Sequence, residues 1–397
     1  MKKKILILGG ALLQSYVIKR AKDLDYEVHV LDMNPDSIGF KLADKYAQIN
    51  IIDQEVCLKY AKDNNIDGVL TAATDYGVLS ASYIAKEMGL NGIKYDVAKI
   101  IKNKYEVRKK LFEKQADDLD QFYEIKKINE LSNISSKIKF PVMVKPCDGS
   151  GSKAANRVDK IEDLEEAVRL AIESSISKKA LIETFINGYE YGVESFVYNN
   201  KINVLAIMQK DMTDPPYYAE LGHTIPSGLS NQMENKIKDS VIKAINALEI
   251  NFGSVNMDLL VTDDGKVCIV DIGARMGGNL IGSHIIPLSK GIDYMGNMIK
   301  AALNEEVDFG PKDNECVSTR LLALTPGKVI KLPDFKKYYD DEIKYIVCNL
   351  EEGDTIREYH NNLDGCGYVV ACGTDPKRIK DKVIEIKNLI DEEIIKD

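Results

Sequence analysis

The chain has 397 residues, of which 45% are hydrophobic and 29% are charged. At roughly 100–200 residues per domain, this length predicts two to four domains with enough apolar sequence for several buried cores. A composition this close to that of globular proteins argues against disorder and against fibrous repeats. The formal net charge of −9 argues against a broad surface for nucleic acid, so an anionic ligand would need a dedicated site.

Cysteine usage and the N-terminus indicate a cytoplasmic protein. The seven cysteines are odd in number and scattered without a C-x-x-C pair, which argues against a disulfide framework and against a zinc site. Three lysines and an apolar run open the chain as in a secretory signal, but Gly9 and Gly10 interrupt the run and no A-x-A cleavage site follows. Because no segment has the run of about 18 apolar residues that a membrane helix needs, we expect no membrane partner.

Short apolar runs alternate with helical stretches over residues 1–95. This rhythm is typical of βαβ units with a parallel sheet. The predicted elements are strands at Ile5–Leu8, Glu27–Leu31 and Gly68–Thr71 and a helix over Ala11–Asp23.

The glycines after the first strand suggest a dinucleotide site, which would make the protein an NAD-dependent oxidoreductase. That site needs three glycines in the pattern G-x-G-x-x-G, and only Gly9 and Gly10 are present. We therefore favour a Rossmann-like topology without this cofactor.

A polar stretch between residues 115 and 140 predicts a domain boundary, after which the signals change to those of antiparallel α+β structure. The predicted elements that follow are a strand ending at Pro146, a helix over Asp163–Glu173, and hairpins turning at Asn199-Asn200 and Asp264-Gly265. The final unit, residues 315–397, has predicted strands at Val317–Leu324, Tyr345–Leu350 and Gly367–Cys372 and a closing helix from Asp375.

The second hairpin carries two facing carboxylates. If Asp264-Gly265 is a two-residue type I′ turn, counting back along both strands places Asp258 directly opposite Asp271. Like charges with Cβ atoms about 5 Å apart repel unless a cation lies between them, and Mg²⁺ prefers carboxylate oxygens together with nucleotide phosphates. The alternative is a pair of solvated acids near the hairpin ends, but apolar neighbours on both faces favour a buried hairpin. A three-residue loop would change this register.

The residues that follow two of the predicted strands carry groups that can bind a phosphate. Arg275, four residues after Asp271, could clamp a phosphoryl group or an acyl phosphate, or it could simply pair with Asp271. Lys145 precedes a loop of glycine and serine, residues 148–152, which can offer N–H and hydroxyl groups to phosphates. This loop does not match the Walker A pattern, and an ordinary turn is the alternative.

Together these motifs resemble the ATP-grasp superfamily of carboxylate–amine ligases over nearly the whole chain. The resemblance implies an α/β Rossmann-like (pre-ATP-grasp) domain at residues 1–112, an α+β ATP-grasp domain at 113–312 and a small α+β ligase domain at 313–397. Within the middle domain it implies a lid at about residues 113–190 and a core at about 191–312.

The resemblance also implies a role for each site residue. Two lysines would contact the ATP phosphates under the closing loop, a following segment would bind adenine, and Glu190 would bind the ribose. The implied ATP ligands are Lys104, Lys145, Asp148, Gly149, Ser150, Gly151, Ser152, Glu183, Phe185, Ile186 and Glu190. Asp258 and Asp271 would hold Mg²⁺ or Mn²⁺, and Arg275 would be the catalytic residue that stabilises the acyl phosphate. Because Asp271 replaces the usual glutamate and Gly273 a common metal-binding asparagine, the number of metal ions is left open.

Within the superfamily, residues 274–278 and 216–227 resemble the L-amino-acid ligases, including carnosine-synthase-like enzymes. This implies that Glu220, His223, Gly277 and Gly278 lie near an amino-acid substrate, although His223 could instead cap a loop. The implied activity is ATP-dependent amide formation from small molecules, by a cytoplasmic homodimer that releases ADP and phosphate. The alternatives are a glycinamide-ribonucleotide-synthetase-like or other nucleotide-pathway ligase, and a non-catalytic ATP-binding protein.

Overall fold

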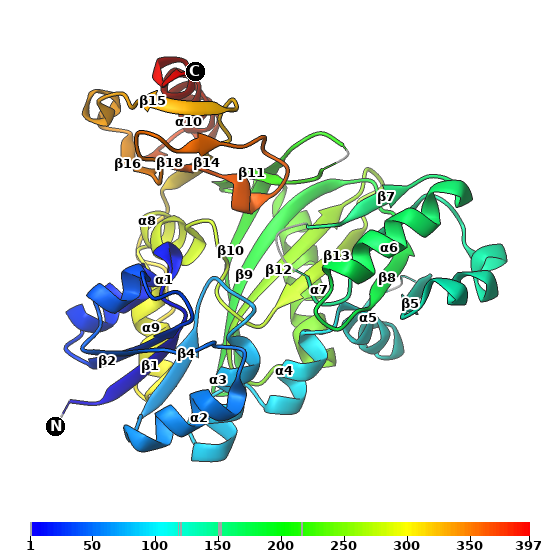
Figure 1. Cartoon of the computed structure of the whole chain (residues 1–397), viewed down its shortest axis with the longest axis horizontal. Coiled ribbons are helices and arrows are strands. Elements are labelled where there is room, and N and C mark those ends of the chain that lie inside the picture. Colours follow the sequence, from blue (N-terminus) through cyan, green and yellow to red (C-terminus); the bar gives the residue numbers. More distant parts are fainter. Residues whose placement is uncertain (1, 118, 120, 150–152, 216) are drawn as a thin grey trace.

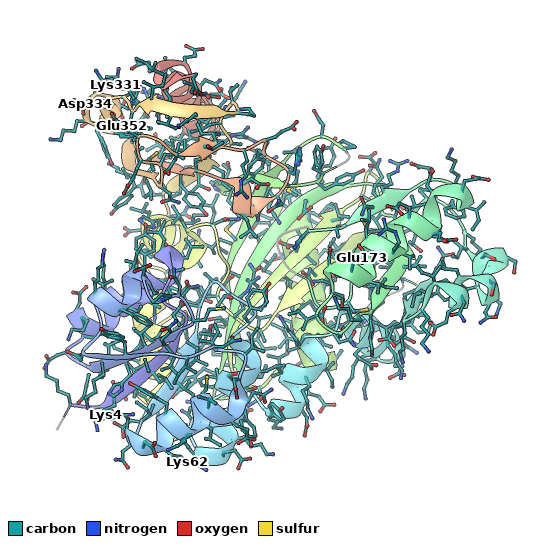
Figure 2. All side chains as sticks on the ribbon, in the orientation of Figure 1. Lys4, Lys62, Glu173, Lys331, Asp334 and Glu352 are labelled. Atoms are coloured by element: carbon teal, nitrogen blue, oxygen red, sulfur yellow. The ribbon has the colours of Figure 1, made fainter. Side chains whose placement is uncertain are left out.

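The computed structural model describes residues 2–117, 119, 121–149, 153–215 and 217–397. Within these residues the strands form four sheets, and the chain builds three groups of elements (Figure 1). Charged side chains such as Lys62, Glu173 and Glu352 lie on the outer surface of these groups (Figure 2). No helix of the described part is both long and apolar enough to cross a membrane.

The N-terminal part is a parallel sheet with helices on both faces, as predicted. Alternate residues of β1 point to opposite sides, so Ile5 and Ile7 pack toward α1 and α9 while Leu6 and Leu8 pack toward α2 and α3. The sheet has the order β3-β2-β1-β4, with β1 (Lys4–Leu8), β2 (Glu27–Asp32), β3 (Lys45–Gln48) and β4 (Gly68–Thr71). Its helices are α1 (Leu12–Asp23), α2 (Gln54–Asp63), α3 (Val78–Met88) and the later helix α9 (Tyr294–Ala302).

The glycine turn after β1 makes its hydrogen bonds within the chain. The Gly10 N–H donates to Asp32 at 2.7 Å, and the Gly10 carbonyl accepts from the Gly39 N–H at 2.7 Å. A Cβ on Gly10 would lie 2.4 Å from the Ser37 hydroxyl, so the following segment covers the turn closely. The backbone groups that would approach a pyrophosphate are therefore already engaged.

Helices α4 (Tyr95–Ile101) and α5 (Lys104–Glu113) lead to a small antiparallel sheet, which has the order β5-β8-β6-β7. The predicted helix after Asp163 is α6 (Leu164–Ser174), and its Leu164 and Val168 pack on the strands of this sheet. The strands are β5 (Phe122–Ile125), β6 (Val142–Pro146), β7 (Asn156–Val158) and β8 (Ala180–Thr184).

An eight-stranded sheet, in the order β13-β12-β9-β10-β11-β14-β18-β16, forms the middle of the molecule (Figure 1). Its central strands are β9 (Tyr189–Tyr198), β10 (Lys201–Met212), β11 (Glu220–Ile225), β12 (Gly253–Val261) and β13 (Val267–Gly273). Its C-terminal strands are β14 (Cys316–Leu321), β16 (Ile343–Cys348) and β18 (Gly367–Gly373). The C-terminal part thus continues the central sheet, while the predicted division into three domains stays a prediction.

The remaining helices and strands pack against this sheet or form a further three-stranded sheet. They are α7 (Asn231–Ala247), α8 (Ile286–Lys290), α10 (Pro376–Glu393), β15 (Gly327–Lys331), β17 (Thr355–Ile356) and β19 (Ile395–Lys396). The closing helix α10 is capped by Asp375, as predicted. The hairpin at Asn199-Asn200 is also confirmed, because both residues have positive φ and Tyr198 pairs with Lys201.

The hairpin that carries Asp258 and Asp271 has the predicted pairing, but its turn differs from the predicted two-residue turn. The turn is a three-residue loop, residues 263–265, since the Thr262 N–H donates to the Lys266 carbonyl at 3.0 Å and Gly265 adopts φ +76° at its end. That loop alone would shift the register by one residue. A β-bulge between the turn and the acids leaves Val270 without a partner and shifts the register back, so Asp258 does lie opposite Asp271.

We predict that Gly222→Ala destabilises the junction between β11 and β14. A Cβ at this position would lie 2.1 Å from the Thr319 carbonyl oxygen, and neither strand can move without losing ladder hydrogen bonds. The expected loss in the free energy of unfolding is about 1–3 kcal/mol, measured by chemical denaturation. Gly310→Ala, where the added Cβ meets only the Asp308 side chain, is the control and should have the smaller effect.

Candidate functional site

One cleft of about 1,020 Å³ collects most of the predicted site residues. It lies between the small sheet, the eight-stranded sheet and the loop after β4. The predicted residues that line it are Lys104, Lys145, Gly149, Glu183, Phe185, Ile186, Glu190, Glu220, His223, Asp258, Asp271, Arg275 and Gly278. Met143, Leu260 and Ile269 add apolar surface near Lys145 that suits an adenine ring.

Two cations neutralise Glu183 at the end of β8. Lys145 Nζ lies 2.7 Å from Glu183 Oε1, and Arg108 Nε donates to Glu183 Oε2 at 3.0 Å. Burial alone would raise the pKa of Glu183, but Arg108 and Lys145 outweigh it and hold that pKa below its ordinary value. Only 6% of the Glu183 side chain is exposed, so it positions Lys145, and its direct contact with ATP stays a prediction.

Arg108 was not found from the sequence. Its guanidinium also donates to Asp117 at 2.6 Å and to the Ile269 carbonyl at 2.9 Å, which ties α5 to β13. The sequence offered one indication of Arg108. It lies four residues after Lys104, the first residue of α5, and residues four apart on a helix lie on the same face.

Lys104 and Asp271 form an ion pair at the mouth of the cleft. Asn103 caps α5, so Lys104 is the first helical residue, and its backbone N–H donates to the Cys147 carbonyl at 2.7 Å. The ammonium lies 2.5 Å from Asp271 Oδ2. Burial would raise the pKa of Asp271, but the nearby lysines outweigh it and keep this carboxylate ionised.

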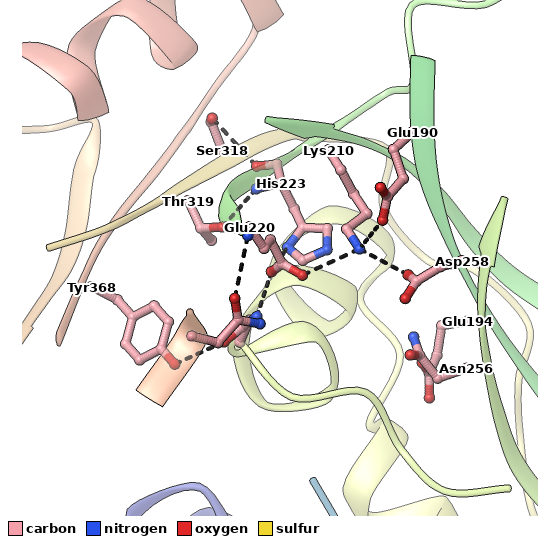
Figure 3. Close-up of polar contacts among 12 residues, drawn as sticks. Glu190, Glu194, Lys210, Glu220, His223, Asn256, Asp258, Ser318, Thr319 and Tyr368 are labelled. Carbon is pink, nitrogen blue, oxygen red and sulfur yellow. Dashed lines mark hydrogen bonds and ion pairs between the residues drawn. The ribbon is translucent and has the colours of Figure 1, made fainter. Parts of the chain in front are cut away.

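Lys210 on β10, which sequence reasoning missed, neutralises the second aspartate (Figure 3). Its ammonium lies 2.9 Å from Asp258, 2.6 Å from Glu190 and 3.4 Å from Glu220. Burial would lower the pKa of Lys210, but the three carboxylates raise it well above its ordinary value. The prediction that a cation must separate the two aspartates was therefore incomplete, because each aspartate has a lysine of its own.

The two aspartates still suit a divalent cation. Their side chains keep 28% and 37% of their surface exposed, for Asp258 and Asp271 respectively, whereas Glu183 is closed off. Within the described residues no three His, Cys, Asp or Glu side chains come together as a metal site. Mg²⁺ commonly takes one or two carboxylates together with phosphate oxygens and water, which matches this pair of ligands.

Arg275 pairs with Asp75 in the loop after β4, so the alternative pairing with Asp271 is wrong. Arg275 Nε lies 3.2 Å from Asp75 Oδ1, and Nη1 donates to Asn256 Oδ1 at 3.2 Å. A Cβ on Gly273 would lie 3.3 Å from the Arg275 guanidinium carbon and 3.4 Å from Asp75. A larger side chain at the position of Gly273 would therefore be crowded by this ion pair.

Glu220 and His223 lie together on β11 (Figure 3), so the loop-cap alternative for His223 is wrong. His223 Nδ1 is 3.2 Å from Glu220 Oε1, and Glu220 accepts a further hydrogen bond from the Asn279 amide. Burial outweighs the attraction of Glu220 and lowers the pKa of His223, which keeps the imidazole neutral near pH 7. Glu220 is thus an acidic group in a polar corner of the cleft.

The predicted phosphate loop is only partly described. The Asp148 carboxylate accepts from the backbone N–H groups of Ile176 at 3.0 Å and Ser177 at 2.7 Å, so it holds a neighbouring turn. The expectation that its side chain binds ATP is therefore not supported by its orientation. Gly149 lines the cleft, and Ser150, Gly151 and Ser152 lie outside the described residues.

The two glycines after Arg275 differ in their surroundings. Gly278 lines the cleft as predicted. Gly277 does not line it, and its N–H points away to donate to the buried Glu194 at 3.2 Å. This hydrogen bond gives Gly277 a structural role in the loop, and its contact with a substrate stays a prediction.

Comparison with known proteins identifies the fold. Residues 138–283 match the family model described as the ATP-grasp domain. The chain contains an ATP-grasp domain. A phosphoribosylglycinamide synthetase from Anaerococcus prevotii shares 25% identity with it at a TM-score of 0.79, over all of both chains. An L-amino acid ligase from Bacillus licheniformis shares 21% identity at a TM-score of 0.85, over 98% of this chain and 97% of that one, which shows a common fold.

Curated relatives cover less of the ATP-grasp chain. A D-alanine–D-alanine ligase of Thermosipho africanus is 27% identical over 246 residues, which are 58% of this chain and 64% of the relative. The chain spans between 40% and 64% of the length of three curated relatives that it matches, this one included. The full-length structural matches confirm the predicted fold class, with its Rossmann-like, ATP-grasp and C-terminal regions.

We predict that Glu183→Ala strongly destabilises the protein. The substitution leaves the buried Lys145 and Arg108 without their shared counter-ion, at an expected cost of about 3–5 kcal/mol in unfolding free energy. Glu166→Ala removes an exposed partner of Arg169 and should cost no more than about 1 kcal/mol by the same denaturation measurement.

The effect of Glu183→Ala also has an expected pH dependence. The pKa of Glu183 is held below its ordinary value of 4.5, so its contribution to stability is present above that pH and is lost as the pH falls further. The difference between wild type and variant should shrink below pH 4.5. A difference that grows on acidification would contradict the role given to this carboxylate.

Proposed function

We propose that this ATP-grasp protein is an ATP-dependent carboxylate–amine ligase that forms an amide and releases ADP and phosphate. The supporting observation is the meeting of two facing aspartates with Lys104, Lys145 and Arg275 in a single cleft. These groups come from three regions of the chain, and their charges suit a polyphosphate accompanied by a divalent cation.

The proposed chemistry has two steps. A carboxylate oxygen of the first substrate attacks the γ-phosphorus of ATP, and the bond to ADP breaks to give an acyl phosphate. The amine of the second substrate then attacks the acyl carbon, phosphate leaves, and the nitrogen loses a proton as the amide forms. No protein nucleophile is needed, because ATP activates the carboxylate.

The residues of the cleft would act by charge and position. Lys104 and Lys145 would hold the phosphates, and Arg275 would stabilise charge on the phosphoryl group during transfer. Asp258 and Asp271 would hold Mg²⁺, which supplies positive charge that offsets the phosphate oxygens when it is bound. Glu190 would bind the ribose hydroxyls, as a carboxylate at the edge of β9 can accept both.

We further propose that the amine or acyl substrate is an amino acid. Of the three carboxylates around Lys210, Glu220 is the one that neither the metal ion nor the ribose takes in this proposal, so it is available to a cationic group. A substrate ammonium suits Glu220, whereas a ribonucleotide phosphate would be repelled. The fold shared with an L-amino acid ligase and the partial match to a D-alanine–D-alanine ligase agree with this proposal.

The main competing function is that of a nucleotide-pathway ligase. The full-length match to a phosphoribosylglycinamide synthetase supports it, and both candidates share ATP, Mg²⁺ and amide formation. ADP release should be measured with amino acids singly and in pairs, and with phosphorylated ribosylamines. Amino-acid-dependent ADP supports the first proposal, ADP only with the ribosylamines supports the second, and ATP binding without turnover supports a non-catalytic binding protein.

We predict that Asp258→Asn lowers turnover by about 100-fold or more, because one charge at the reacting phosphates is lost. Steady-state ADP release and calorimetric titration with Mg·ATP provide the two measurements. Asp263→Asn removes the same charge at the exposed tip of the same hairpin and should leave both values unchanged. Equal activity of the two variants would contradict the assigned metal ligands.

We predict that Glu220→Gln raises the KM for the amino-acid substrate while the Kd for Mg·ATP stays close to that of wild type. The amide keeps the size of the side chain but removes the charge that attracts an ammonium. A change confined to ATP affinity would contradict the placement of the substrate.

We also propose that the protein is a homodimer, and light scattering on the purified protein tests this oligomeric state.

A further inference from the structure

A buried carboxylate, that of Glu194, lies beside Asn256 and is not among the residues that line the cleft (Figure 3). Glu194 on β9 has no exposed surface and pairs in register with Asn256 on β12. The mechanism proposed above does not use it, and the sequence motifs did not single it out.

Neutral groups donate all the hydrogen bonds that hold this carboxylate. Glu194 Oε1 accepts from the Tyr294 hydroxyl at 2.5 Å, and Oε2 accepts from Asn256 Nδ2 at 3.0 Å. The Gly277 N–H donates to both oxygens, at 3.3 and 3.2 Å. Both carboxylate oxygens are thus engaged, and each donor belongs to a different element.

Asn256 links Glu194 to Arg275 through the two ends of one amide. Asn256 Oδ1 accepts from Arg275 Nη1 at 3.2 Å, while Nδ2 donates to Glu194. A guanidinium has only donors and a carboxylate only acceptors, so the amide has a single favourable orientation. The position of the guanidinium therefore depends on an acceptor that does not touch it.

The backbone after Arg275 rests on the same carboxylate. A Cβ on Gly277 would lie 2.8 Å from Asn256 Nδ2 and 3.0 Å from Glu194 Oε2, so only glycine fits this contact without a shift. In addition to its ion pair with Asp75, Arg275 is thus held by its side chain through Asn256 and by its loop through the Gly277 amide.

We propose that Glu194 is a positioning residue which, through Asn256 and the Gly277 amide, fixes the Arg275 guanidinium beside the phosphoryl group that is transferred. The inference rests on the proposed ligase function, because it gives Arg275 a part in phosphoryl transfer. Glu194 itself contacts neither substrate nor nucleotide.

A carboxylate at this place is unfavourable for burial, which indicates a functional reason for it. Burial raises the pKa of Glu194 to about 7, although Tyr294, Arg275 and Asn256 oppose the shift. Tyr294 has a pKa well above its ordinary value and stays protonated, and Arg275 stays charged. Asp75, across the guanidinium, stays ionised because Arg275 and the nearby lysines outweigh its burial. Glu194 is thus the member of this group that changes charge near neutral pH.

Glu194→Gln tests the proposal with almost no change in shape. The new amide nitrogen cannot accept. At the Oε2 position it faces Asn256 Nδ2, and at the Oε1 position it faces the Tyr294 hydroxyl, which can accept from it. If Asn256 turns to satisfy it, the Asn256 nitrogen faces the Arg275 guanidinium and displaces it. We expect kcat to fall about 10- to 100-fold, as for other residues that orient a functional group, with the Kd for Mg·ADP unchanged.

Glu305→Gln is the matched control. Glu305 also accepts from a tyrosine hydroxyl, that of Tyr26 at 2.6 Å, and it pairs with Lys3 away from the cleft. The same chemical change there should leave kcat unaltered. Equal activities of Glu194→Gln and wild type, or equal losses in both variants, would overturn the proposal.

Two further measurements separate positioning from a loss of folding. The complex of Mg·ADP with aluminium fluoride, which mimics the transferring phosphoryl group, should bind more weakly to Glu194→Gln while Mg·ADP alone binds equally well. In wild type kcat should rise with pH through about 7 as Glu194 ionises, and this limb should vanish in Glu194→Gln. Tyr294→Phe removes one donor and keeps the carboxylate, so it should move the limb to higher pH.

The outcomes distinguish this inference from the proposed function. If wild type releases no ADP with any substrate pair, the ligase function is contradicted. The role of Glu194 is then tested only by comparing how tightly wild type and Glu194→Gln bind the aluminium fluoride complex. An active wild type whose pH limb and fluoride affinity are the same in Glu194→Gln overturns the role of Glu194 and leaves the ligase function standing.

Discussion

The pairing of buried charges between separate parts of the chain organises the cleft. Lys104 from α5 pairs with Asp271 on β13, Lys210 on β10 with Asp258 on β12, and Arg275 with the loop after β4 through Asp75. Removing charges from water is costly, and each pair recovers that cost only if both partners stay in place. The same contacts that allow these residues to be buried therefore fix the elements that carry them.

This arrangement also suits an anionic ligand with a counter-ion. In the proposed function, a polyphosphate would compete with Asp271 for Lys104, and a divalent cation would take the place of that lysine beside the carboxylate. Exchanging one partner for another keeps every charge compensated, whereas removing a partner leaves a buried charge alone. Asp271 keeps 37% of its side chain exposed, which suits such an exchange, whereas Glu183 keeps only 6% exposed.

Glu194 differs from these groups because neutral donors hold it. A charge-neutral residue would be less costly to bury, yet only an acceptor on both oxygens can orient Asn256 and the Gly277 amide together. Asn256, which pairs with Glu194 between β9 and β12, connects this carboxylate to Arg275. Geometry at the site thus depends on residues that never meet the substrate.

Local sequence patterns determined the elements and much of the site. Alternating apolar runs predicted the parallel N-terminal strands, and turn chemistry predicted the hairpin at Asn199-Asn200, because both depend on residues close together in the chain. Counting residues back from the turn also predicted that Asp258 faces Asp271. The observed pairing is the same because the register shift from the longer loop is cancelled by the bulge at Val270. The partners Arg108, Lys210, Asp75 and Glu194 were decided only by the tertiary structure. Each meets its partner across strands or loops distant in sequence, where spacing carries no information about contact.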